Sequence, residues 1–380
     1  MKFESINLSR LSSVLMFLFF LSPYLGLVPF AYGIMLIGVL LQIQRIKLTL
    51  YDYGIFLILG IFFCVKLFQV NFAVWDALVR YYFGVIIVFL FIKVNKANLN
   101  IERLISILFW AVLFEAIIIN TLINPFQYLP NYPRSVFDFN LTSHYTKFMG
   151  FYQRPYSVGM NASTSSTIAC GLLMYRATQI QHKIIEPQKK VEIYGLATII
   201  LFASGVGLSL CFFYLLYRMQ LITFKRVIIL FVILAIVISG YDKIIGFFAE
   251  DSIFQKVSAA YMEYLFDFKI DQVHDVILVL KDPKNSLWIG QAFNEKSEII
   301  IQSDFAWNDF IQCFGILGPL MYLSFLVNKF NRYNILPILV FLVGAFHYGG
   351  VFTLPGQIIL AFMLLYLNEI SIVIKENEAC

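Results

Sequence analysis

Apolar runs long enough to cross a bilayer recur from Leu11 to Leu367, and only two long polar stretches interrupt them. A helix needs about 20 apolar residues to cross the hydrocarbon core of a bilayer. Of the 380 residues, 60% are hydrophobic and 13% are charged, and this charged share is about half that of a typical soluble domain. The chain is therefore predicted to be an all-α polytopic membrane protein, with one integral membrane domain over residues 1–380.

The apolar segments predict about twelve transmembrane helices, some of them short or re-entrant. They lie at residues 11–24, 27–43, 53–70, 73–93, 102–123, 157–176, 192–203, 206–217, 227–240, 305–327, 335–348 and 353–367. The SGVG break at residues 204–207 predicts a hairpin of two short helices, because neighbouring helices can satisfy the backbone groups that such a break frees. No small-residue cleavage site follows the first segment, so we expect it to remain as an anchor.

Basic residues gather in the short connections, which predicts the orientation of the chain. With a cytoplasmic N-terminus, 17 of the 28 Lys and Arg residues lie on the cytoplasmic side, as the positive-inside rule requires. Residues 124–156 and 241–304 then form two long extracytoplasmic loops, and both termini are cytoplasmic. A single span in place of the hairpin would instead put residues 241–304 in the cytoplasm.

The two predicted outer loops differ in charge. The first carries Arg134, His144, Lys147 and Arg154 among aromatic and Pro residues, whereas the second holds 11 acidic residues, 6 Lys and no Arg. In the second loop Asp recurs every four residues at 267, 271 and 275, which is the spacing of one helix face. An amphipathic helix on the membrane surface and a plain solvated face both explain this spacing.

The first outer loop ends in the pattern GFYQRPYSVG at residues 150–159. Pro155 suits the first turn of the next helix, and Gly159 permits a close approach by a neighbouring chain or a ligand. Arg154 would then precede a helix N-terminus, whose free N–H groups favour an anion. An Arg there binds phosphate through two parallel hydrogen bonds, although anchoring of the helix at headgroup level explains it equally well.

This pattern resembles the loop-to-helix motif of the O-antigen polymerase and ligase superfamily. Other segments similar to motifs of that family are SGVG at 204–207, WIG at 288–290, DFAW at 304–307 and FGILG at 314–318. The family often has an Arg a few residues before the first-loop Gly, where this chain has Lys147. The ligase branch tends to place a His at the end of the second loop, where this chain has Asp304, so the resemblance favours the polymerase branch.

The resemblance implies a metal-independent and cofactor-free glycosyltransferase at the outer face of the bacterial inner membrane. Such an enzyme polymerises undecaprenyl-diphosphate-linked oligosaccharide repeat units, which serve as donor and acceptor, into O-antigen, capsule or exopolysaccharide. The lipid bilayer, a chain-length regulator and a flippase are its expected partners, and nucleic acid is not. The alternatives are a ligase that transfers glycan to another acceptor and a transporter of polysaccharide or lipid-linked sugar.

Arg154 and Asp304 are the expected catalytic residues. Arg154 would stabilise the diphosphate leaving group, and Asp304 would orient or deprotonate the acceptor hydroxyl. An interfacial helix cap explains Asp304 as well. The expected substrate-binding residues are Arg80, Arg134, His144, Lys147, Tyr156, His274 and His347.

Asp76, Arg80 and Glu115 fall inside predicted spans, where charged residues usually pair or face a cavity. Asp76 and Arg80 are four residues apart on one helix face, so they form either a structural ion pair or part of the diphosphate site. Glu115 has no nearby partner in the sequence, and we expect it to be neutral or hydrogen-bonded to another helix.

Overall fold

The computed structural model is built from helices, and the residues that it describes contain no β-strand, so the all-α prediction is confirmed. The described residues are 8–46, 49, 52, 57, 83–121, 152–219, 229, 271–278, 280–281, 287–290, 306–331, 333–347 and 349–378.

Most of the described residues lie in α-helices joined by short connections. The α-helices are α1 (Leu8–Leu21), α2 (Val28–Leu40), α5 (Gly84–Asn95), α6 (Ile101–Asn120), α8 (Ala162–Gln181), α9 (Lys189–Leu201), α10 (Gly205–Arg218), α14 (Ala306–Phe314), α15 (Leu317–Val327), α16 (Ile335–Val343) and α17 (Leu354–Glu378). The 3-10 turns are η1 (Ser22–Leu25), η2 (Ile43–Arg45), η5 (Ser157–Gly159), η7 (Gly344–Phe346) and η8 (Gly350–Phe352).

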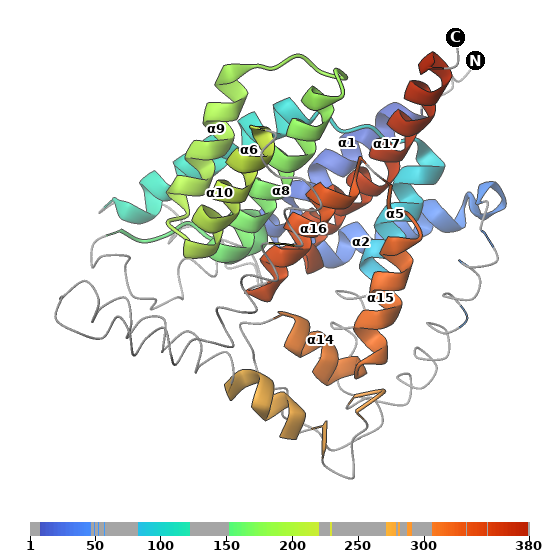
Figure 1. Ribbon diagram of the computed structural model, residues 1–380. Helices are drawn as coiled ribbons and strands as arrows, with labels where there is room; N and C mark the ends of the chain where they lie inside the picture. The colour runs from blue at the N-terminus through green and yellow to red at the C-terminus, as the bar shows by residue number, and fades with distance from the viewer. Residues whose placement is uncertain are drawn as a thin grey trace.

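Helix α8 is the centre of the bundle. It packs against α6, α9, α10, α16 and α17, and its residues 162–178 are all buried (Figure 1). Its first turns, residues 163–167, are Ser and Thr, and several of their hydroxyls bond to carbonyls of the preceding turn. Small side chains let helix backbones approach closely, and here Gly207 lies against Ser166 while Gly344 and Gly350 lie against Thr167.

The bundle has two chemically different ends. At the basic end, which is the upper end in Figure 1, α1, α6 and α9 begin and α8 and α10 finish, and Arg176 and Arg218 lie there. At the turn end lie the 3-10 turns η1 and η5 and the connection from α9 to α10. Arg10 and Arg103, at the starts of α1 and α6, belong to the basic end.

The predicted hairpin is confirmed, because α9 and α10 are separate helices joined at residues 202–204. Ser204 caps α10 by accepting a hydrogen bond from the Gly207 N–H, and its hydroxyl donates to the Ser163 hydroxyl of α8 at 3.0 Å. The connection is thereby bonded to the first turn of the central helix.

Two helix boundaries differ from the prediction. The helix predicted to begin at residue 157 begins at Ala162, because the preceding residues form the turn η5. The helix predicted over residues 305–327 is broken into α14 and α15, which are bent by 113°. The break lies at Gly315, whose φ of 64° is left-handed and does not continue an α-helix.

In the described part of the chain, no single helix is both long enough and apolar enough to cross a membrane, but the bent pair α14 and α15 meets that test together. Several shorter apolar helices accompany them, among them α2, α5 and α10. A further helical segment at residues 271–278 exposes Asp271 and Asp275, as both explanations of the Asp spacing expect, and it also exposes Val273, Ile277 and Leu278.

Candidate functional site

Residues 152–161, which we call the corner, lead from the first predicted loop into α8. The corner lies at the turn end and contacts α6, α9 and η1. Every one of these neighbours bonds to it through a specific side chain or carbonyl. The segment around Arg154 is therefore hydrogen-bonded to three different elements.

Glu115 of α6 is the main anchor of the corner. Its side chain is 1% exposed, and its Oε1 atom accepts hydrogen bonds from the N–H groups of Tyr156 at 2.8 Å and Ser157 at 3.2 Å. Its Oε2 atom accepts from the Tyr24 hydroxyl at 3.1 Å, and Tyr24 also bonds to the Ser157 hydroxyl at 2.9 Å. The expected hydrogen bonding of Glu115 to another part of the bundle is therefore confirmed.

The residues before Arg154 are held by two further contacts. Asn120, at the end of α6, pairs with the backbone of Gln153 in both directions, at 2.7 Å from the Gln153 N–H and 2.8 Å to its carbonyl. The Tyr152 hydroxyl donates to the Leu201 carbonyl at the end of α9. Burial, and secondly the negative charge of Glu115, raise the pKa of Tyr152 to about 12, so this hydroxyl keeps its proton at neutral pH.

The corner contains strained backbone that these bonds hold in place. Ser157 and Met160 have φ values of 51° and 56°, a left-handed conformation that costs non-glycine residues about 1–2 kcal/mol each. The Ser165 hydroxyl accepts from the Gly159 N–H at 2.8 Å and donates to the Tyr156 carbonyl. A Cβ atom on Gly159 would lie 2.6 Å from the Ser165 nitrogen, so no larger residue fits there.

Five backbone N–H groups of the corner, those of residues 153, 156, 157, 159 and 160, are already bonded within the protein, which corrects one expectation. Pro155 lies seven residues before α8, and the side chain of Asn161 caps that helix by accepting from the N–H groups of Ser163 at 2.8 Å and Thr164 at 3.4 Å. An anion at this place would therefore be bound by the Arg154 side chain rather than by free N–H groups of the helix.

Arg154 is the half-buried cation of the corner. Within the described residues, its guanidinium makes no hydrogen bond and no ion pair. Its backbone lies between Gln153, which Asn120 holds, and Tyr156, which Glu115 holds. An arginine whose backbone is held, and whose guanidinium has no partner in the described residues, is well suited to a phosphate ligand. Guanidinium matches phosphate with two parallel hydrogen bonds.

The WIG segment at residues 288–290 and the FGILG segment at residues 314–318 come together at the break between α14 and α15. The N–H groups of Ile316 and Leu317 donate to the carbonyls of Leu287 and Trp288, at 3.0 Å and 3.1 Å. A Cβ atom on Gly315 would lie 2.2 Å from the carbonyl carbon of Trp288. The WIG and FGILG segments, 25 or so residues apart in the chain, thus form one tight backbone contact.

A glycine pair connects the corner region to the start of α14. Gly350 packs against Thr167 and the Thr164 carbonyl of α8, and Gly349 packs against Ala306, the first residue of α14. Asp304 lies outside the described residues, but it precedes Ala306 by two positions. The segment at residues 349–350 therefore lies between the first turns of α8 and the first residue of α14.

Other predicted site residues differ in their surroundings. His347 lies between η7 and η8, close in sequence to the glycine pair, and is half-buried. Tyr156 is buried in the corner, and His274 is exposed on the helical segment at residues 271–278. The residues Asp76, Arg80, Arg134, His144, Lys147 and Asp304 lie outside the described residues.

An aromatic cluster covers the start of α14. The Trp307 ring contacts the rings of Phe310, Tyr322 and Phe352 at centroid distances of 6.1, 6.2 and 5.2 Å. Trp307 is half-buried, and among the described residues its buried indole nitrogen and the buried Tyr322 hydroxyl have no hydrogen-bond partner. The exposed part of the Trp307 ring, three residues after Asp304, is chemically suited to pack against a sugar.

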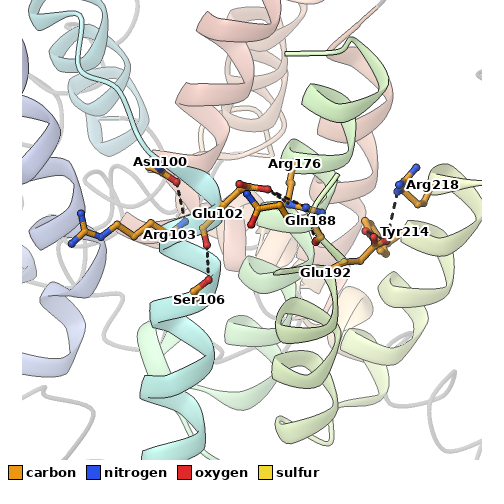
Figure 2. Close-up of polar contacts among 9 residues, drawn as sticks. All are labelled: Asn100, Glu102, Arg103, Ser106, Arg176, Gln188, Glu192, Tyr214 and Arg218. Carbon is orange, nitrogen blue, oxygen red and sulfur yellow. Dashed lines mark hydrogen bonds and ion pairs between the residues drawn. The ribbon is translucent and has the colours of Figure 1, made fainter. Parts of the chain in front are cut away.

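The basic end carries a buried polar network that sequence reasoning missed (Figure 2). Arg176 of α8 is 0% exposed and donates from Nε and Nη2 to the Glu102 carboxylate, at 3.3 Å and 3.1 Å, and from Nη2 to the Gln188 carbonyl at 3.0 Å. Glu192 of α9 accepts from the Tyr214 hydroxyl of α10 at 2.8 Å. This network joins α6, α8, α9 and α10 at the basic end, opposite the corner.

A second ion pair lies outside the predicted spans. The Lys329 ammonium is 2.9 Å from the Asp52 carboxylate and 4.5 Å from the centre of the Phe325 ring. Partial burial acts to raise the pKa of Asp52, but the bonds from Lys329 and Thr49 outweigh it and hold that pKa below its ordinary value. Where the described residues are concerned, no three His, Cys, Asp or Glu side chains come together to hold a metal ion.

Comparison with protein families, curated proteins and solved structures finds no match for this chain.

Proposed function

We propose that this chain is a membrane glycosyltransferase that polymerises undecaprenyl-diphosphate-linked oligosaccharide units at the outer face of the bacterial inner membrane. The proposal includes about twelve transmembrane helices, cytoplasmic termini and two outer loops. The observation that carries it is the corner, which holds Arg154 on a rigid backbone with its guanidinium available to a diphosphate. The proposed family rests on the resemblance of the sequence motifs, and the geometry of the corner supports the role of this residue.

In the proposed reaction, the bond between the donor sugar and its lipid diphosphate breaks, and a bond from that sugar to an acceptor hydroxyl forms. The diphosphate leaves with the electron pair, and the hydroxyl proton passes to a carboxylate, for which Asp304 is the candidate. Arg154 binds the diphosphate and stabilises the negative charge that grows on it. Donors fixed in place before the reaction act more strongly than donors that must reorganise, which is why the anchoring by Glu115 and Asn120 supports this role.

The acceptor end of the proposed site is the start of α14. Trp307 and the aromatic cluster give this place a surface that suits a sugar ring, and the Gly349–Gly350 segment links it to α8. This link supports a site in which donor diphosphate and acceptor sugar are bound side by side. A ligase that transfers glycan to another acceptor shares the donor half of this proposal and differs in the acceptor.

The test is the pattern of surface glycan made by cells that express the protein and its variants. Arg154→Ala is expected to lower polymer formation on the order of 100-fold or more, because it removes a donor to the leaving group. Gln153→Ala is the matched control, since Gln153 contacts Asn120 through its backbone and its side chain is equally half-buried. Membrane levels of all variants are measured on the same samples.

Long-chain polysaccharide from Arg154→Ala at the wild-type level would refute the assignment. A deletion strain separates the two enzyme classes. Loss of a polymerase leaves single lipid-linked units, whereas loss of a ligase leaves lipid-linked polymer.

A further inference from the structure

A groove of about 400 Å3 opens at the basic end of the bundle, between α1 and the start of α6. Its lining residues are Arg10, Ser13, Val14, Phe17, Asn98, Leu99, Asn100 and Arg103. The groove has two arginines and an apolar wall, and none of the residues that line it is acidic. It lies at the opposite end from the corner and takes part in no step of the proposed reaction.

Hydrogen bonds between its two sides build the groove. The Ser13 hydroxyl of α1 accepts from the Asn98 N–H at 2.9 Å, which fixes α1 against the segment before α6. The Asn100 side chain caps α6 by accepting from the Arg103 N–H at 2.9 Å. The two sides of the groove are therefore held at a set separation.

The charge of Arg103 is not neutralised by the acidic residue beside it. The Glu102 carboxylate is bonded to the buried Arg176, and Figure 2 shows Arg103 and Arg176 on opposite sides of α6. Within the described residues, the Arg103 guanidinium makes no hydrogen bond or ion pair. Arg10 and Arg103 are both exposed.

The apolar wall continues along the outside of α1. Leu11, Val14 and Leu18 are 45%, 53% and 54% exposed on this helix, and Val14 also lines the groove. A small soluble anion would contact only the arginines. An amphiphile would use the arginines for its charge and the wall for its hydrocarbon.

We propose that this groove binds an anionic phospholipid of the cytoplasmic leaflet, with its phosphate between Arg10 and Arg103 and an acyl chain along α1. Basic pockets between helices on the cytoplasmic side of membrane proteins recognise anionic lipid headgroups in this way. The inference rests on the membrane orientation in the proposed function, and it does not depend on the polymerase reaction. Binding at this place would fix the basic end of the bundle at the membrane surface.

The test is native mass spectrometry of the full chain in a neutral detergent, titrated with phosphatidylglycerol and with phosphatidylcholine. Phosphatidylglycerol is expected to bind more tightly. Because each basic residue near anionic lipid contributes about 1 kcal/mol, Arg10→Gln or Arg103→Gln is expected to weaken its binding about fivefold, and the double variant roughly thirtyfold. Val14→Glu, which adds a carboxylate to the apolar wall, is expected to weaken it as well.

Arg45→Gln is the matched control, because Arg45 is an exposed arginine outside the groove. Unchanged binding in the Arg10 and Arg103 double variant would overturn the proposal, and so would an equal loss in Arg45→Gln. Equally tight binding of water-soluble glycerol phosphate would overturn it in favour of a soluble anion site. Lipid binding is measured without any glycan substrate, so a chain that binds the lipid but makes no polymer would refute only the proposed function.

Discussion

Replacing Glu115 by alanine is expected to release the corner from α6. The substitution removes the acceptor of the Tyr156 and Ser157 N–H groups, and both of these residues are buried. The Tyr24 hydroxyl keeps its bond to the Ser157 hydroxyl. The corner is therefore expected to lose its main anchor while the neighbouring helices keep their packing.

The magnitude follows from the two N–H groups that lose their partner. Leaving a buried donor unsatisfied costs about 1–3 kcal/mol, so two donors give about 2–6 kcal/mol. Glu115→Gln keeps an acceptor oxygen and loses only the charge, and it should cost about 1–2 kcal/mol. In the wild type the bonds from Glu115 outweigh the left-handed conformation of Ser157, which costs about 1–2 kcal/mol. Without them this residue is expected to relax.

The assay is hydrogen exchange of the peptide that carries residues 152–161, measured on the purified full chain in detergent. A loss of 2 kcal/mol or more lowers protection of the Tyr156 and Ser157 amides by about 30-fold or more. Glu186→Ala removes an exposed carboxylate and serves as the control. Wild-type protection of the corner in Glu115→Ala would refute this account of what holds it.

Three further predictions concern the scaffold. Glu102→Ala leaves the buried Arg176 without its carboxylate, and a loss of about 3–5 kcal/mol is expected in unfolding experiments, against a small change for the exposed Glu186→Ala. Because the folded-state pKa of Asp52 is depressed, its contribution to stability is complete above the ordinary carboxyl pKa and is lost as the pH falls through the folded-state value. Lys329→Met should reduce this acid dependence of the unfolding midpoint, because only the bonds from Thr49 then lower the pKa. Gly315→Ala is expected to lower the unfolding midpoint or the yield of folded protein, because its Cβ would lie 2.2 Å from a backbone carbon; a variant as stable as wild type would contradict the tight contact at this break.

Patterns that act within a few residues of each other predicted the fold well. The SGVG segment predicted the hairpin of α9 and α10, since Ser204 and the glycines act locally as a cap and a break. Pro155 suits the first turn of a helix, and this pattern predicts a start at residue 157, five residues before the observed start of α8 at Ala162. The Asn161 side chain, followed by a run of Ser and Thr, is a local capping pattern that would have located the start at Ala162.

Features that depend on distant residues were outside the reach of sequence reasoning. The backbone of Tyr156 bonds to Glu115, which is 41 residues earlier, and no local pattern identifies that pairing. The burial of Arg176 arises from three other helices packing around α8. Gly315 breaks the helix where the backbone of Trp288 packs against it, and no local pattern identifies that contact.

The central claim is that Arg154 binds the lipid diphosphate of the donor during polymerisation. The most direct measurement uses the purified full chain in a bilayer nanodisc with undecaprenyl-diphosphate-linked oligosaccharide, and follows released undecaprenyl diphosphate together with glycan length. The wild type and Gln153→Ala are expected to release the lipid diphosphate and lengthen the glycan, and Arg154→Ala is expected to do neither above about 1% of the wild-type rate. Equal rates for Arg154→Ala and wild type, or no longer glycan from the wild type, would contradict the claim.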